Sequence, residues 1–127
     1  MNMNRIEIPL SLPPKELSPN ARVHWRVKAR FTKSARSISA CAAIIASDMQ
    51  RLQWKAARVK CVFTFGDKRK RDKDNLLASM KAYFDGIADA GVVENDSQLT
   101  YEPVEITAPN RLQKRVVIHI EQTEASE

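Results

Sequence analysis

The stretch RVKCVFTF, residues 58–65, alternates two kinds of position along its whole length. Val59, Cys61 and Phe63 occupy one set of alternate positions, and successive side chains of an extended strand point to opposite faces of a sheet. The stretch is also rich in the β-branched and aromatic residues that are enriched in strands. The sequence therefore predicts a β-strand here, with the other elements placed before and after it along the chain.

Two helices are expected, one on either side of this strand. The Ala-rich run that begins at Thr32 has apolar residues at helical spacing, which predicts an amphipathic helix. The second helix begins at Asp74 or Asn75, either of which is a good N-cap, and Gly91 is its expected stop. The predicted apolar face of the first helix is Ile38, Cys41, Ala42, Ile45, Met49 and Leu52. That of the second is Leu76, Leu77, Met80, Phe84 and Ile87.

Three further segments have the pattern of strands. Residues 5–10, RIEIPL, alternate, and Pro9 argues for an edge or an end of the sheet. Residues 97–106 and 112–122 are separated by the turn-forming sequence TAPNR, which predicts a hairpin. The predicted fold class is α/β, a single domain over residues 1–127. It has a small mixed sheet of about four strands with two helices packed against it, in the order β-α-β-α-β-β.

Composition narrows the class of partner. The formal charge of +6, from 21 Lys and Arg against 15 Asp and Glu, favours polyanions, although it does not distinguish DNA, RNA and an acidic membrane surface. No apolar run approaches the roughly 18 residues of a transmembrane helix, and the N-terminal sequence lacks the apolar core of a secretory signal. A cytoplasmic location is therefore expected. Cys41 and Cys61 lie in apolar segments without metal-binding spacing, which suggests buried thiols in a reducing compartment.

Two carboxylates, Asp72 and Asp74, lie inside the most basic stretch of the chain. Their basic neighbours are Lys68, Arg69, Lys70, Arg71 and Lys73. In extended backbone, residues i and i+2 point to the same side, so both carboxylates can face one hard divalent cation such as Mg²⁺. The neighbouring cations offset the repulsion between the two acids and also attract a phosphodiester. An Asp at a helix start is often only an N-cap, so this motif alone leaves a purely structural interpretation open.

Lys81 and Asp96 are two further candidates. Lys81 follows Asp74 by seven positions, which is a rotation of roughly 20° on a continuous helix, with Ala78 between them. Its ammonium group can then reach a phosphate held near the helix N-terminus. A simpler interpretation is that Lys81 forms an i,i+4 ion pair with Asp85. Asp96 lies where the next strand begins.

The segment RDKDNLLASMKAYFDGIADAGVVENDSQL, residues 71–99, resembles the RusA family of Holliday junction resolvases, small DNA endonucleases commonly found in phages and prophages. The shared pattern is D-x-D-N-L, then a Lys before a Phe-Asp pair, then an acidic turn that ends in D-S-Q. The sequence IPLSLPP, residues 8–14, matches an N-terminal element of the family. The resemblance implies a homodimer that uses Mg²⁺, or Mn²⁺, without an organic cofactor and makes paired nicks in four-way DNA junctions.

Carried over by position, the family's catalytic and metal-binding acids fall on Asp72, Asp74 and Asp96. Some members have the active-site lysine four residues after the second acid, where this chain has Ala78. Counting back from the Phe-Asp pair places that lysine on Lys81, and Lys81 is the expected active-site lysine.

The activity implied by the resemblance is phosphodiester hydrolysis in DNA recombination and repair, in a bacterial or phage-infected cell. The three acids hold one or two Mg²⁺ ions that polarise the phosphate and lower the pKa of the attacking water, and Lys81 stabilises the developing charge. The expected DNA contacts are Lys68, Arg69, Lys70, Arg71, Lys73, Asn75, Arg22, Arg26, Lys28 and Arg30. Two alternatives stay open: a non-catalytic basic nucleic-acid-binding protein, and a nuclease that acts on other branched DNA.

Chain length raises a question about Asp96. A continuous helix from Asn75 to about Ala90 is roughly 24 Å long, and the five residues 91–95 extend at most about 17 Å. Asp96 then has difficulty returning to Asp72 in its own subunit. Either the helix is shorter or bent, or a two-fold dimer supplies Asp96 of the partner subunit.

Overall fold

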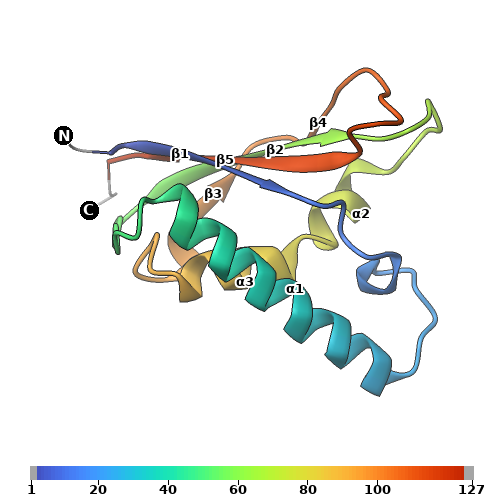
Figure 1. The fold of residues 1–127 in the computed structure, drawn as a ribbon, viewed down its shortest axis with the longest axis horizontal. Coiled ribbons are helices and arrows are strands. Elements are labelled where there is room, and N and C mark those ends of the chain that lie inside the picture. Colours follow the sequence, from blue (N-terminus) through green and yellow to red (C-terminus); the bar gives the residue numbers. More distant parts are fainter. Residues whose placement is uncertain (1–2, 125–127) are drawn as a thin grey trace.

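Helices cover one face of a mixed sheet, as seen in the computed structural model, which describes residues 3–124 (Figure 1). The elements in chain order are β1 (Arg5–Leu10), α1 (Trp25–Ala46), β2 (Ala57–Thr64), α2 (Lys73–Ala78), α3 (Lys81–Asp89), β3 (Leu99–Tyr101), β4 (Glu105–Ile106) and β5 (Arg115–Gln122). Two short 3-10 turns, η1 (Lys15–Leu17) and η2 (Asp96–Gln98), complete them. The predicted α/β class is confirmed. None of the helices in the described part of the chain is long and apolar enough to cross a membrane.

The sheet is organised around β2, the strand predicted from RVKCVFTF. Its strands lie in the order β1-β5-β2-β3, and β4 also pairs with β2. β3 and β4 run parallel to β2, whereas β5 runs antiparallel to both β2 and β1. β1 is an edge strand, as Pro9 predicted, because its other side has no neighbour in this order.

The predicted hairpin between residues 97–106 and 112–122 is wrong. β4 and β5 do not pair with each other but lie on opposite sides of β2. The reason is the length of the available partners: β5 pairs with β2 over eight positions, from Arg115 to Gln122, whereas β4 has only two residues. Pairing with β2 therefore satisfies far more backbone groups of β5 than a hairpin would.

The two faces of the sheet carry different kinds of side chain, apolar on one face and charged on the other. The face toward α1 and α3 is built from alternate residues of the three long strands: Ile6, Ile8, Leu10, Val59, Cys61, Phe63, Val116, Ile118 and Ile120. On the opposite face, side chains pair across strands. Arg58 lies within ion-pair distance of Glu102 and Glu121, and Lys60 Nζ lies 3.1 Å from Glu105. The helices thus pack on one face only, which Figure 1 shows.

α1 begins at Trp25, well before the predicted start at Thr32. His24 is its N-cap, and the ring Nδ1 of His24 accepts a hydrogen bond from the backbone N–H of Arg26 at 3.1 Å. This cap satisfies one of the free N–H groups of the first turn. Arg26, Lys28 and Arg30, which the predicted start at Thr32 left outside the helix, therefore lie on it.

The predicted buried face of α1 is also wrong. The helix buries Ala35, Ser39 and Ala43, and leaves Ile38 and Ile45 exposed. Cys41 is exposed as well, contrary to the prediction, whereas Cys61 is buried as predicted.

Close packing of α1 on α3 explains this reversal. On the α3 side, Gly86 lies directly against Arg36, Ser39 and Ala40 of α1, and the small residues four positions before and after it, Ala82 and Ala90, are buried. The hydroxyl of Ser39 donates to the carbonyl oxygen of Tyr83 at 2.6 Å, so the two backbones lie within reach of one short side chain. Small residues on both helices permit this approach, and Ile38 and Ile45 of α1 are left on the outer face.

The second predicted helix is split into α2 and α3. The break falls at Ser79 and Met80, where the Ser79 hydroxyl donates to the carbonyl of Leu76 at 2.6 Å. Asp72, not Asp74 or Asn75, is the N-cap. The predicted burial of Met80, Phe84 and Ile87 is confirmed, whereas Leu76 and Leu77 are only half-buried. The predicted stop at Gly91, which has a φ of 80°, is also confirmed.

Candidate active site

Asp72 lies at the junction between the basic loop and α2. Its Oδ1 accepts hydrogen bonds from the backbone N–H groups of Asp74 at 2.9 Å and Asn75 at 3.3 Å. Because α2 begins at Lys73, the backbone between the two acids is helical and not extended as expected. Both capping bonds use Oδ1, so Oδ2 is the oxygen of Asp72 that is available to a ligand. Asp74, in the first turn of α2, is exposed.

A hollow of about 310 Å³ adjoins Asp72 and Asn75. Its opposite wall is the segment after β1, with Leu12, Pro13 and Pro14. Residues 12–14 and residues 71–79, which are far apart in the sequence, therefore line the same hollow. Carboxylate and amide groups lie on one side and an apolar wall on the other.

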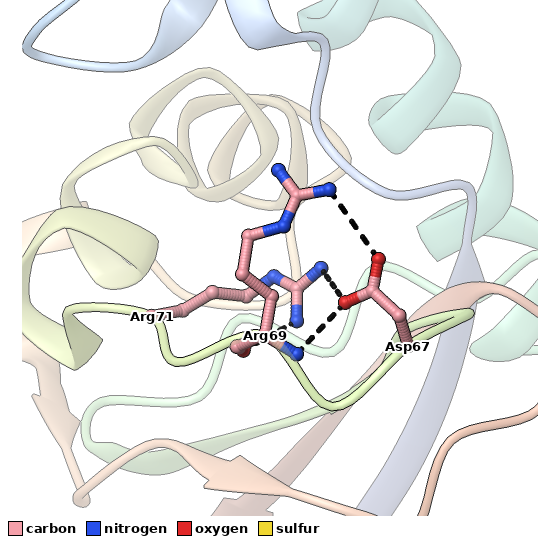
Figure 2. A network of polar contacts seen from close by, with 3 residues as sticks. All are labelled: Asp67, Arg69 and Arg71. Carbon is pink, nitrogen blue, oxygen red and sulfur yellow. Dashed lines mark hydrogen bonds and ion pairs between the residues drawn. The ribbon is translucent and has the colours of Figure 1, made fainter.

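Arg71 is held in a fixed orientation at the rim of the hollow. Its guanidinium group donates to the carboxylate of Asp67 and to the carbonyl oxygen of Arg69, at 2.9 and 2.8 Å, and lies 3.7 Å from the ring centroid of Phe65. Figure 2 shows the Asp67 carboxylate facing the guanidinium groups of both Arg69 and Arg71. The backbone N–H of Arg69 and then the Arg71 guanidinium hold the pKa of Asp67 below its ordinary value. Arg71 is thus a preoriented cation beside Asp72.

A second hollow, of about 400 Å³, continues from the first along the shared residues Leu12, Phe65 and Arg71. Arg111 and Lys114, from the loop between β4 and β5, line it. Neither residue was expected from the sequence, because both lie about 40 positions after the basic loop and belong to no motif. Their positive charge was the only sequence signal.

Lys81 lines a third hollow, of about 230 Å³, with Lys28 and Thr32 of α1. Its Nζ lies 3.6 Å from Asp85, and its side chain is 78% exposed. Since the helix breaks before Lys81, the continuous face that was expected to join it to Asp74 does not exist. Ser79 lines both this hollow and the one beside Asp72, so the two are neighbours.

Asp96 is exposed at the start of η2. Asn95 and Gln98 form a capping box around this turn. Figure 1 shows α2 and the segment that leads into β3 at opposite ends of α3. Asp96 belongs to the surroundings of Tyr101, whose pKa is raised first by burial and then by the charges of Asp96 and Asp85.

Within residues 3–124 no three or more His, Cys, Asp or Glu side chains gather closely enough to hold a metal ion. A single subunit therefore does not unite Asp72, Asp74 and Asp96. The predicted difficulty with chain length is consistent with this finding.

The remaining predicted DNA contacts lie on two surfaces. Lys68, Arg69, Lys70 and Lys73 are exposed in and just after the basic loop, and Arg22, Arg26, Lys28 and Arg30 are exposed before and along the first turns of α1. At the start of α1 the Trp25 ring stacks on His24, and the Arg26 guanidinium lies 5.2 Å from the Trp25 ring centroid. An exposed aromatic ring beside a cation is a surface on which a nucleobase can stack.

Comparison with known proteins assigns no activity. No protein-family model matches the chain. A protein of Xylella fastidiosa (strain Temecula1) that is described as uncharacterized is 37% identical over 89 residues, which make up 64% of this chain and 54% of that protein. The chain thus spans about half the length of this relative.

Proposed function

We propose that this protein is a metal-dependent, structure-specific DNA endonuclease of the RusA type, which resolves four-way junctions by hydrolysing phosphodiester bonds. The observation that carries the proposal is the position of Asp72. Asp72 lines, together with Arg71 and Asn75, the hollow whose other wall is residues 12–14, and the Arg71 guanidinium is held by Asp67. An acid that lies near the fixed guanidinium group of Arg71 and the exposed cations of the basic loop suits a site that binds a phosphate together with its counterion.

The donor set fits a hard divalent cation. Asp72 Oδ2 and the exposed carboxylate of Asp74 supply oxygen ligands from neighbouring positions at the start of α2, and Mg²⁺ or Mn²⁺ takes such ligands together with water and phosphate oxygens. A bound ion supplies an activated water and charge stabilisation. No organic cofactor is part of the proposal.

The residues of the chain then have separate tasks. Arg71, held by Asp67 and the Arg69 carbonyl, binds a phosphate oxygen without having to be ordered first. Lys81, on the neighbouring hollow, is free to turn from Asp85 toward developing negative charge, since its side chain is largely exposed. Asn75 lines the first hollow beside Asp72 and contributes an amide to the same surface.

The third carboxylate of the proposed site is Asp96 of the partner subunit. Within one chain Asp96 belongs to the surroundings of Tyr101, in the turn η2 that follows α3, whereas Asp72 caps α2, which precedes α3. A two-fold homodimer resolves this separation, because each subunit can give its own Asp96 to the other. Two sites related by a dimer axis also suit paired nicking of a branched substrate.

Cleavage of a synthetic four-way junction tests the proposal. Wild-type protein with Mg²⁺ is expected to nick opposing strands, and Asp74→Asn to reduce the rate by roughly two or more orders of magnitude, as for the loss of one group that stabilises transition-state charge. Asp48→Asn is the matched control, because Asp48 lies in the turn after α1. Equal cleavage by wild type and Asp74→Asn, or none by wild type, would contradict it. Flap and fork substrates show whether other branched DNA is preferred.

A non-catalytic nucleic-acid-binding protein is the second candidate, and the exposed Trp25 with its stacked Arg26 favours it. The two functions differ in one measurement. Neutralising Asp72 or Asp74 strengthens phosphate binding under both, since it removes negative charge, but it abolishes turnover only in a nuclease.

A further inference from the structure

The outer face of α1 carries bulky apolar side chains that face water. Ile38 is 54% exposed and Ile45 is 74% exposed, with the exposed Cys41 between them. At 100° per residue these three positions fall within about 60° of one another around the helix. Met49, just beyond the helix end, is 77% exposed. We call Ile38, Cys41, Ile45 and Met49 the outer apolar stripe.

This stripe is not a by-product of a helix that packs poorly. The opposite side of α1 buries Ala35, Ser39 and Ala43, and the helix packs closely on α3 through Ser39. Figure 1 shows α1 along the outside of the molecule, with α3 and the sheet on its other side. Phe31 and Ile44 of the same helix pack against the core, whereas Ile38 and Ile45 are left uncovered by their own chain. Contiguous exposed apolar residues mark interaction surfaces.

We propose that a second copy of this chain covers the outer apolar stripe, through two-fold antiparallel pairing of α1 with α1 centred near Cys41. This deepens the proposed function, because it names the surface through which the proposed homodimer forms. The pairing rests on α1 alone and does not depend on nuclease activity.

The charge distribution along α1 selects this occupant and this orientation. The cations of the helix all lie in its N-terminal part: Arg26, Lys28, Arg30, Lys33 and Arg36. Residues 37–46 carry no charged side chain. Parallel pairing would bring ten like charges side by side, which is costly, whereas an antiparallel crossing near Cys41 joins the uncharged halves and directs the basic halves apart.

The size of the stripe sets the expected strength of the dimer. Residues 37–46 extend about 15 Å along the helix axis, and one such helix pair covers less than the roughly 800 Å² per partner of a standard stable interface. We therefore expect a dimer that dissociates in the micromolar range. Small residues beside the stripe, Ser34, Ser37 and Ala42, permit the close approach of two helices.

Mass measured in solution tests the surface without DNA or metal. In sedimentation equilibrium, wild-type protein is expected to change from 14.4 kDa toward twice that mass over about 1 to 200 μM. Ile45→Glu is expected to stay monomeric with an unchanged circular dichroism spectrum, because its side chain is largely exposed. Leu112→Glu is the matched control, since Leu112 is 94% exposed in a loop, and is expected to dimerise like wild type. A wild-type monomer throughout, or an Ile45→Glu dimer of wild-type strength, overturns the proposal.

Cross-linking with a short bismaleimide tests the orientation. Cys41 is expected to link to its copy, because a residue near a two-fold axis meets itself. Cys61 is buried, and burial raises the pKa of its thiol to about 12, so Cys41 is the reactive thiol. In a Cys41→Ser background, Ser34→Cys is expected not to cross-link, since the two copies of residue 34 lie roughly 21 Å apart along an antiparallel pair. A link through residue 34, or none through Cys41, overturns the antiparallel crossing.

These outcomes separate the interface from the enzyme. If the Ile45→Glu variant dimerises and nicks junctions, the outer apolar stripe is not the dimer interface, and the proposed function is unaffected. A wild-type dimer that Ile45→Glu disrupts, but that never cuts DNA, supports the surface and refutes the nuclease.

Discussion

A methyl group added at Gly86 in α3 would overlap the carbonyl oxygen of Arg36 in α1. The same methyl group would lie 2.9 Å from the backbone nitrogen of Ala40. Both neighbours are backbone atoms of a long helix and cannot move alone. The absence of a Cβ at one position therefore sets the distance between the two helices.

Gly86→Ala is expected to lower the free energy of unfolding by about 1–3 kcal/mol, because overpacking forces the two backbones apart and outweighs the gain in helix propensity. Urea denaturation measures the change. The matched control is Gly66→Ala, whose new methyl group would lie 3.1 Å from Cδ of the flexible Lys114 side chain. That control is expected to stay within about 0.5 kcal/mol of wild type. Equal stability of both variants would show that α1 and α3 are not in such close contact.

Phe84→Ala is expected to cost about 3–5 kcal/mol, the usual range for removing a core phenylalanine. Phe84 is buried on α3, and its ring centroid lies 4.9 Å from that of Tyr101. Thermal or urea unfolding measures the loss. Trp25→Ala removes a larger but exposed ring, and we expect little change in stability with a measurable loss of DNA affinity. A stable Phe84→Ala protein would contradict the placement of α3.

Stability is expected to fall in acid partly through the ion pair of Arg36 with Asp89. The Arg36 guanidinium donates to both carboxylate oxygens and holds the pKa of Asp89 below its ordinary value. A lowered folded-state pKa means that the stabilisation is present above the unfolded value of about 3.9 and is lost as the pH falls through the folded value. Asp89→Asn is therefore expected to be less stable than wild type at pH 7, with a gap that narrows below about pH 4. Urea midpoints between pH 7 and pH 2.5 measure this, and a gap that stays constant with pH would exclude the ion pair as its cause.

Arg111→Gln with Lys114→Gln is expected to weaken junction binding and to make its salt dependence shallower, by about 0.9 in log–log slope for each phosphate that the variant no longer neutralises. The reason is that both residues line the hollow that continues from Arg71. Titrations of junction DNA in Ca²⁺ at several salt concentrations measure the slope. Lys55→Gln, in a different hollow beside Trp54, is the control. An unchanged slope would remove the loop between β4 and β5 from the DNA-binding surface.

Mixing two inactive variants tests the sharing of carboxylates between subunits. If Asp96 acts across the dimer, a heterodimer of Asp72→Asn with Asp96→Asn keeps one site with both acids, so the mixture is expected to regain single-strand nicking. If Asp96 acts within its own chain, every site in the mixture lacks one acid. Nicking assays on the mixture and on each variant alone distinguish these two cases. Failure to recover activity would place Asp96 in the site of its own subunit or outside any site.

Local patterns predicted the long strands of the sheet well, whereas the strand expected over residues 97–106 is split into η2, β3 and β4. The alternation in residues 5–10 and 58–65 corresponds to β1 and β2, and the stop at Gly91 follows from its positive φ. These features depend on residues only a few positions apart in the chain, so they can be predicted from the sequence alone. The α/β class followed from them, because the order of strands and helices limits how the layers can pack.

Contacts between distant segments were beyond the reach of such patterns. Apolar spacing indicated that α1 is amphipathic, but it assigned the wrong face to the core, because the contact with α3 selects small residues and not bulky ones. Pairing between β4 and β5 was expected from a turn, yet the eight-residue edge of β2 offered β5 a better partner. Arg111 and Lys114 join the basic surface only through the position of their loop.

The order of residues along the chain is enough to say which chemical groups this protein can use: acids beside a basic loop, a lysine in the helical segment that follows, and strands with one apolar face. Which of those groups meet depends on the folded molecule. Folding broke the second helix before Lys81, separated Asp96 from Asp72 within one chain and left two isoleucines of α1 facing water. The physical reason is that side-chain type and spacing act over a few residues, whereas backbone approach, strand pairing and burial are set by the competition among all segments at once.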